Sequence, residues 1–159
     1  ELGVRRILPL ETAHTVVQVP DEKLDRKLER WRRIVGDAAR QCERSVTPEI
    51  AEPVSVEVAL SISSAGRDFV AHARHRSASL TETLSQIEEP DDVPIRCWIG
   101  PEGGFADHEV SAFEEHGADF FGLGPRILRT ETAATVALTL LQEHLGDLNE
   151  TARAGSPRG

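Results

Sequence analysis

The chain has 159 residues, 39% of them hydrophobic, and a formal net charge of −9, which suits one domain with a single core. No apolar run approaches the ~20 residues of a membrane-spanning helix, and the acidic balance argues against strong nucleic-acid binding by this chain alone. Cys42 and Cys97 are too few for a disulfide framework, so we expect two buried apolar thiols in a reducing, cytoplasmic setting.

The first half of the chain alternates between strand-like and helix-like segments. Residues 4–10 predict a short strand that ends at Pro9. Residues 23–44 predict an amphipathic helix, because apolar side chains recur every three or four positions. Residues 54–65 are ambiguous: their β-branched alternation favours a strand, whereas their position before Gly66 also suits a helix.

The second half continues this alternation. Strands are predicted at residues 68–73, 95–99 and 119–123, and helices at residues 107–116 and 130–145. The last helix is apolar around most of its circumference, which predicts burial in a core or at a subunit interface. Alternating strands and helices predict an α/β fold with a mostly parallel sheet. We expect residues 1–147 to form the domain and the polar tail, residues 148–159, to be disordered.

Two glycine-rich turns follow predicted strands: GPEGG at residues 100–104 and GLGPR at residues 122–126. Turns of this kind lie at the carboxyl edge of an α/β sheet, where ligands bind. Glycine reaches positive φ angles and lets a ligand approach the backbone closely. The two turns therefore predict one pocket for a small cofactor, built from neighbouring strands.

Missing motifs narrow the choice of cofactor. The sequence has neither the G-x-G-x-x-G turn of dinucleotide-binding folds nor the lysine-containing loop of nucleoside-triphosphate sites. Its only lysines, Lys23 and Lys27, lie far from both turns in the sequence. No cysteine and histidine set has metal-ligand spacing, so we expect no metal site.

Two longer motifs, IGPEGGF at residues 99–105 and LGPRILRTETA at residues 123–133, resemble those of the SPOUT-class methyltransferases. Together with QCxR at residues 41–44, they resemble the RsmE family in particular. The resemblance covers about residues 1–147. It implies an S-adenosylmethionine-dependent enzyme that methylates N3 of a uridine in 16S ribosomal RNA of the small subunit.

The resemblance also implies structure. SPOUT domains carry a carboxyl-terminal trefoil knot, here about residues 97–145, and act as homodimers with the last helix near the interface. The two turns would cradle S-adenosylmethionine. The residues that would contact it are His72, Gly100, Pro101, Gly103, Leu123, Gly124, Ile127, Leu128 and Ala133.

Two departures from the family stand out. The family has an additional amino-terminal RNA-binding barrel domain, which this sequence does not contain, so we expect the chain alone to be inactive. The family often has serine where Ala106 stands, so the helix after GPEGG is expected to lack its N-cap oxygen. Asp107 would compensate partly through the helix dipole.

The chemistry of methyl transfer indicates candidate catalytic residues. A cation that stabilises the uracil anion, or a base that takes the N3 proton, would lower the barrier. Arg129 is the first candidate cation and Arg126 the second, and Glu102 and Glu131 are the candidate bases. Structural roles compete: Arg126 and Glu131 could simply pair, and Glu102 could only satisfy backbone amides.

Contact with RNA is assigned to Arg44 and Gln41, with a structural salt bridge of Arg44 as the equal alternative. The basic character of residues 21–44 suits a phosphate backbone and equally a solvated helix face. Two other functions remain open beside the enzyme: a non-enzymatic RNA-binding fragment, and a nucleotide- or phosphate-binding α/β module.

Overall fold

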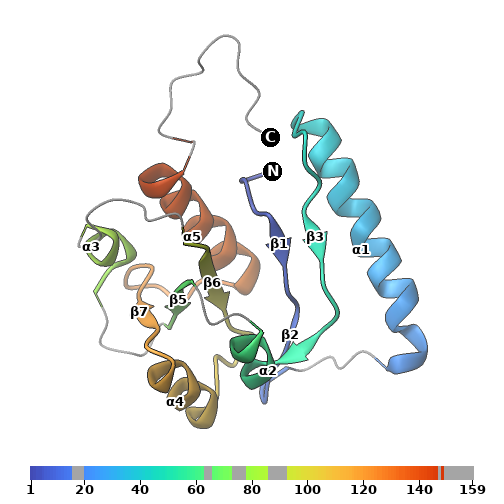
Figure 1. Cartoon of the computed structure of the whole chain (residues 1–159). Coiled ribbons are helices and arrows are strands. Elements are labelled where there is room, and N and C mark those ends of the chain that lie inside the picture. The colour runs from blue at the N-terminus through green and yellow to red at the C-terminus, as the bar shows by residue number, and fades with distance from the viewer. Residues whose placement is uncertain (16–19, 63–65, 73–77, 86–92, 147, 149–159) are drawn as a thin grey trace.

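The computed structural model describes residues 1–15, 20–62, 66–72, 78–85, 93–146 and 148, so the predicted disordered tail lies almost wholly outside the described residues. At its centre is a parallel sheet with the strand order β6-β5-β7. These strands are Ile95–Ile99, Arg67–Ala71 and Asp119–Phe121. Helices cover both faces of the sheet (Figure 1). The predicted α/β fold with a parallel sheet flanked by helices is confirmed.

The helices divide between the two faces. α2 (Val56–Ser61) and α4 (Asp107–Glu115) pack on one face, and α3 (Leu80–Leu84) and α5 (Thr130–Leu145) pack on the other. The strands supply both cores because successive side chains point to opposite faces. In β5, Phe69 enters the α3–α5 core and Val70 enters the α2–α4 core.

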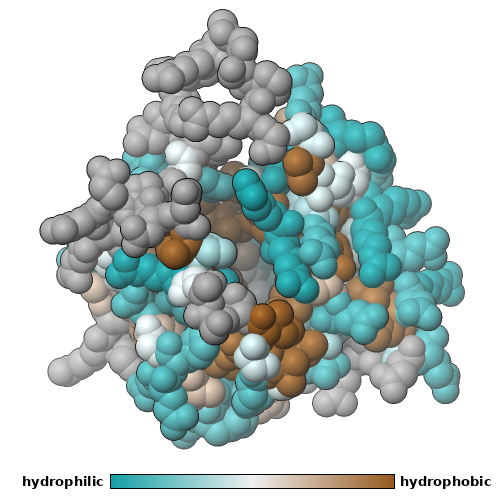
Figure 2. Space-filling view, in the orientation of Figure 1, coloured by the Kyte–Doolittle hydropathy of each residue, from teal (hydrophilic) through white to brown (hydrophobic). Residues whose placement is uncertain are grey.

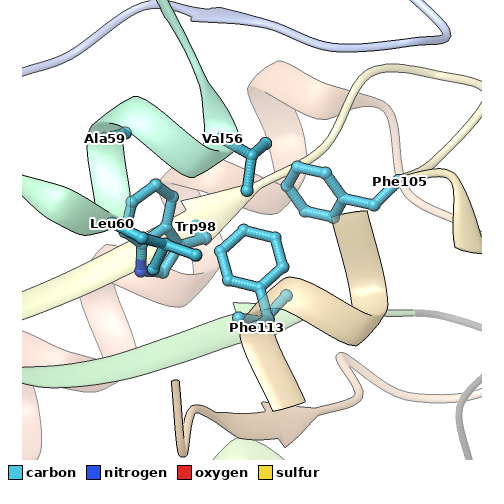
Figure 3. Close-up of a cluster of buried hydrophobic side chains, with 7 residues drawn as sticks. Val56, Ala59, Leu60, Trp98, Phe105 and Phe113 are labelled. Atoms are coloured by element: carbon cyan, nitrogen blue, oxygen red, sulfur yellow. The ribbon is translucent and has the colours of Figure 1, made fainter. Parts of the chain in front are cut away.

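The α2–α4 core is the more aromatic of the two (Figure 3). The ring of Phe113 lies edge-on to Trp98 and to Phe105, with 5.0 Å between ring centroids in each pair. Edge-to-face pairs at this separation add specific attraction to the burial of apolar area. Phe105 directly follows the GPEGG turn, so this core fixes one end of that turn.

The amino-terminal part forms two further pairs of short parallel strands. β1 (Arg6–Ile7) pairs with β3 (Glu49–Ile50), and β2 (Leu10–Glu11) pairs with β4 (Val54–Ser55). The prediction of one strand over residues 4–10 was wrong. Pro9 separates β1 from β2, because proline has no N–H group to continue a ladder.

Local signals explain the helix boundaries. α1 (Asp21–Gln41) ends before the predicted residue 44, and Glu43 just beyond it has a positive φ of 58°. Residues 54–65 contain both predicted structures, because β4 leads directly into α2 and the Ser55 hydroxyl caps α2. α3 was not predicted, although Ser79 and Glu82 form a complete capping box at its start.

A buried ion pair holds the amino-terminal edge of the central sheet. Asp68, only 5% exposed, accepts hydrogen bonds from Arg96 Nε and Nη2, both 2.6 Å long. Its Oδ1 also accepts the indole N–H of Trp98 at 2.7 Å. The carboxylate therefore joins β5 to β6 and satisfies the indole N–H of the aromatic core.

Cys97 on β6 is partly buried and packs beside the α3–α5 core, and Cys42 is likewise partly buried, so the prediction of two buried thiols holds only in part. Burial raises the pKa of the Cys97 thiol to about 12. The thiolate is the nucleophilic form of cysteine, so this group is a packing residue and not a catalytic one.

Asp68→Ala should lower the free energy of unfolding by about 3 to 5 kcal/mol, because it leaves a guanidinium, on a side chain that is only 19% exposed, and a buried indole N–H without their carboxylate. Arg67→Ala is the matched control. It removes an exposed ion pair between the adjacent position of β5 and Asp119 on β7 (3.3 Å), and should cost less than about 1 kcal/mol. Urea denaturation of both variants tests this prediction, and equal losses would contradict it.

Candidate functional site

The carboxyl ends of the three central strands meet at one edge of the sheet and border a cavity of about 660 Å³. His72 follows β5, and Gly100 follows β6. Beyond β7 the chain continues into residues 123–129. The two glycine turns come from β6 and β7, which lie on either side of β5 and are not direct neighbours. The single pocket predicted from both turns is present, at a size typical of small-molecule sites.

Glycine is required in the turn of residues 100–104, which we call the 100–104 turn. Gly104 has a φ of 74°, a conformation that residues with a Cβ atom rarely adopt. A Cβ at Gly100 would lie 3.3 Å from the Phe105 ring. The turn is also tied to α5, because the Thr130 hydroxyl donates to the carbonyl oxygen of Gly100 at 3.0 Å.

Residues 123–128 contribute the opposite wall. Gly124 has a φ of 90° and open space where a Cβ would stand. Leu123, Ile127 and Leu128 line the cavity, and Ile127 is 76% exposed. An apolar side chain this exposed leaves a hydrophobic wall that a bound ligand would cover.

A third wall comes from the other end of the chain. His14 lines the cavity, and its Nδ1 lies 3.0 Å from the carbonyl oxygen of Gly104. The N–H of Ala13 donates to Glu109 Oε1 on α4 at 2.9 Å. Glu109 is 3% exposed, and its Oε2 accepts the N–H of Ala106 at 2.7 Å. The sequence analysis missed this wall, because its contacts join residues 90 or more positions apart.

All nine residues assigned to the cofactor lie in the wall of this cavity: His72, Gly100, Pro101, Gly103, Leu123, Gly124, Ile127, Leu128 and Ala133. The wall also contains residues to which the sequence analysis gave no ligand or catalytic role, among them Phe105, Asp107 and His108. Among the described residues, no three His, Cys, Asp or Glu side chains converge as a metal site would require.

The candidate catalytic residues are divided. Glu102 and Arg126 line the cavity, both exposed. Arg129 and Glu131 are exposed at the start of α5 and are not part of the cavity wall. Although Arg126 and Glu131 are both described, the structure shows no ion pair between them.

The candidate RNA residues lie at the carboxyl end of α1. The Arg44 guanidinium donates to the carbonyl oxygen of Val4 at 2.9 Å, which ties the end of α1 to the residues before β1. This is a structural contact, but with a backbone carbonyl and not the expected salt bridge. Gln41 is exposed. Figure 2 shows hydrophilic surface along the outer side of α1, where Arg26, Arg30 and Arg33 are exposed.

A smaller apolar cavity of about 330 Å³ lies between α1 and the β1–β3 pair. Its wall contains only apolar side chains: Ile7, Pro9, Trp31, Ile34, Val35 and Ile50. It lacks the convergent polar groups that orient a ligand, so the 660 Å³ cavity is the candidate site. None of the helices formed by the described residues has the length and apolar character that a bilayer crossing requires.

Comparison with known proteins assigns the family. A family model described as an RNA methyltransferase domain matches residues 1–142. The chain belongs to this family. Curated relatives named ribosomal RNA small subunit methyltransferase E confirm the resemblance to RsmE. The Bacillus subtilis protein is 33% identical over 144 residues, covering 89% of this chain and 56% of the relative. The Synechocystis protein is 38% identical over 141 residues, covering 87% and 44%.

Solved structures of similar proteins agree with this family assignment. A putative methyltransferase from Legionella pneumophila, in complex with S-adenosylmethionine, is 35% identical with a TM-score of 0.80, covering 89% of this chain and 56% of that one. Ribosomal RNA small subunit methyltransferase E from Neisseria gonorrhoeae, bound to S-adenosylmethionine, is 30% identical with a TM-score of 0.79, covering 92% and 57%. The chain thus spans about half the length of these relatives.

Ala106→Ser should stabilise this RNA methyltransferase domain by about 1 kcal/mol. Ala106 already has the extended N-cap conformation, with φ −75° and ψ 160°, but offers no oxygen to α4. A serine hydroxyl would accept the N–H of Glu109. This would complete the capping box, because the Glu109 carboxylate already accepts the N–H of residue 106. Thermal or urea denaturation measures the gain, and an unchanged stability would contradict the account of this helix start.

Proposed function

We propose that this chain is the S-adenosylmethionine-dependent catalytic domain of a methyltransferase acting on small-subunit ribosomal RNA. The observation that carries the proposal is the cavity at the carboxyl edge of the sheet, which both glycine turns and all nine expected cofactor residues line. The similarity to two structures that contain S-adenosylmethionine supports the choice of ligand.

The cavity fits this cofactor. Leu123, Ile127 and Leu128 provide an apolar wall for the adenine ring. Gly124 lets the ligand approach the backbone, because open space lies where its Cβ would stand. When bound, the cofactor supplies an electrophilic methyl group on a sulfonium. The residues of the chain must then hold the uracil ring in line with that methyl group and manage the N3 proton.

Arg126 is better placed than Arg129 for stabilising a uracil anion, because only Arg126 lines the cavity. Glu102 is similarly better placed than Glu131 to accept the N3 proton. Both residues belong to the two glycine turns, so the turns would hold the cofactor and also present the charged groups. The proposal therefore ranks Arg126 before Arg129, which is the reverse of the order predicted from the sequence.

The family resemblance extends the proposal. We infer a trefoil knot over about residues 97–145, a homodimer with α5 near the interface, and a cytoplasmic enzyme. The partly exposed apolar residues Val136 and Leu138 on α5 support an interface there. N3 of a uridine in 16S ribosomal RNA is the proposed target. Residues 1–147 would be the catalytic domain, and RNA affinity would depend largely on the barrel domain of the family.

The other two functions have less support. An RNA-binding fragment without activity rests on the basic outer face of α1 alone. A nucleotide-binding module would use the same turns, but the wall of the cavity contains no lysine. Neither explains the similarity to methyltransferases over nearly the whole chain.

Calorimetric titration with S-adenosylhomocysteine tests the cofactor assignment. We expect one molecule bound per chain at micromolar Kd, with no competition from ATP. Gly124→Ala should weaken binding about tenfold or more, because alanine at a φ of 90° strains the turn. A folded chain that binds ATP but not S-adenosylhomocysteine would favour the nucleotide-binding module instead.

In a protein that joins this chain to the barrel domain of the family, Arg126→Ala should lower the rate of methyl transfer to small-subunit ribosomal RNA more than tenfold, through loss of transition-state charge stabilisation. Arg129→Ala is the matched control and should reduce the rate less. Transfer of a radiolabelled methyl group, with the affinity for S-adenosylhomocysteine measured in parallel, separates chemistry from binding. A larger loss for Arg129→Ala would restore the order expected from the sequence.

A further inference from the structure

Residues 12–15 form a turn (the 12–15 turn) that is held by hydrogen bonds between its own residues. Thr12 N–H donates to the Thr15 hydroxyl oxygen at 3.1 Å, the two threonine hydroxyls lie 2.8 Å apart, and the N–H of Thr15 donates to the carbonyl oxygen of Thr12 at 3.0 Å. The buried carboxylate of Glu109 anchors the same turn to α4 through the N–H of Ala13. The imidazole of His14 therefore projects from a fixed base.

His14 contacts the 100–104 turn in two ways. Its Nδ1 lies 3.0 Å from the carbonyl oxygen of Gly104. A Cβ placed on Gly103 would stand 2.9 Å from the Cβ of His14, so the two backbones approach as closely as glycine allows. The 100–104 turn is thus held between His14 on one side and the Thr130 hydroxyl, which binds the Gly100 carbonyl, on the other.

The hydrogen bond determines where the imidazole proton lies. A carbonyl oxygen can only accept, so Nδ1 must carry the hydrogen. In the neutral ring this is the Nδ1–H tautomer, and Nε2 then carries none. The tautomer is a property of the folded chain and can be measured without any ligand.

We propose that His14 is a positioning residue of the cofactor cavity: its Nδ1–H fixes the Gly104 carbonyl and so holds the 100–104 turn in the shape that accepts the ligand. The role rests on the proposed function of the cavity as an S-adenosylmethionine site. Through His14, the amino-terminal part of the chain contributes to a cavity whose two sequence motifs, IGPEGGF and LGPRILRTETA, both lie after residue 98. Preorganisation of a turn increases affinity by removing the entropic cost of ordering it on binding.

Three substitutions at one position test the proposal. The amide nitrogen of asparagine is as many bonds from the backbone as imidazole Nδ1, so His14→Asn keeps the donor to Gly104. In His14→Gln the donor is displaced by one bond, and His14→Ala removes it. Calorimetry with S-adenosylhomocysteine should show about tenfold weaker binding for the alanine and glutamine variants, and less than threefold for asparagine. Melting temperatures of all variants establish whether each is folded.

Nitrogen-15 NMR of the free wild-type chain provides the independent readout, with the Nδ1–H tautomer expected for His14. If the wild type binds and His14→Ala binds equally well, or if Nε2–H is the observed tautomer, the positioning role is overturned. If all three variants weaken binding equally, His14 acts by packing and the hydrogen bond is not the cause. A folded wild type that shows the Nδ1–H tautomer but binds no S-adenosylhomocysteine overturns the proposed function instead, and with it the role of His14 towards this ligand.

Discussion

Parallel pairing of β5 with both β6 and β7 is the constraint on which the rest of the structure depends. It aligns the three strands in one direction, so that His72, Gly100 and the chain beyond Phe121 emerge at the same edge. Glycine turns that lie about 20 residues apart in the sequence thereby become opposite walls of one cavity. A change in the order or direction of these strands would separate the turns while leaving each motif intact.

The two ends of the central sheet have different tasks. At the amino-terminal edge, charged groups are paired: Asp68 with Arg96, and Arg67 with Asp119. At the carboxyl edge, Glu102 and Arg126 are exposed to the cavity. Pairs at the first edge fix the register of the strands, which leaves the second edge free to present charges that a substrate can meet. Under the proposed function, stability and chemistry would be separated along the length of β5.

The sequence predicted those parts of the fold and site that depend on local pattern. The glycine turns, the strands before them and the long helices α1 and α5 were all found, because each is specified within a short window. The 12–15 turn escaped prediction because its importance lies in contacts with Gly104 and Glu109, far along the chain. The sequence could not predict that Arg126 lies in the cavity wall and Arg129 outside it. These positions depend on how the chain folds before α5, which begins at Thr130.

The central claim is that one ligand occupies a cavity formed by the 100–104 turn, residues 123–128 and His14 of the 12–15 turn. Backbone amide NMR spectra of the chain, recorded during addition of S-adenosylhomocysteine, test it most directly. The account predicts that shifts concentrate in these three segments and at His72. Shifts centred on the apolar cavity between α1 and the β1–β3 pair, with the glycine turns unchanged, would contradict it.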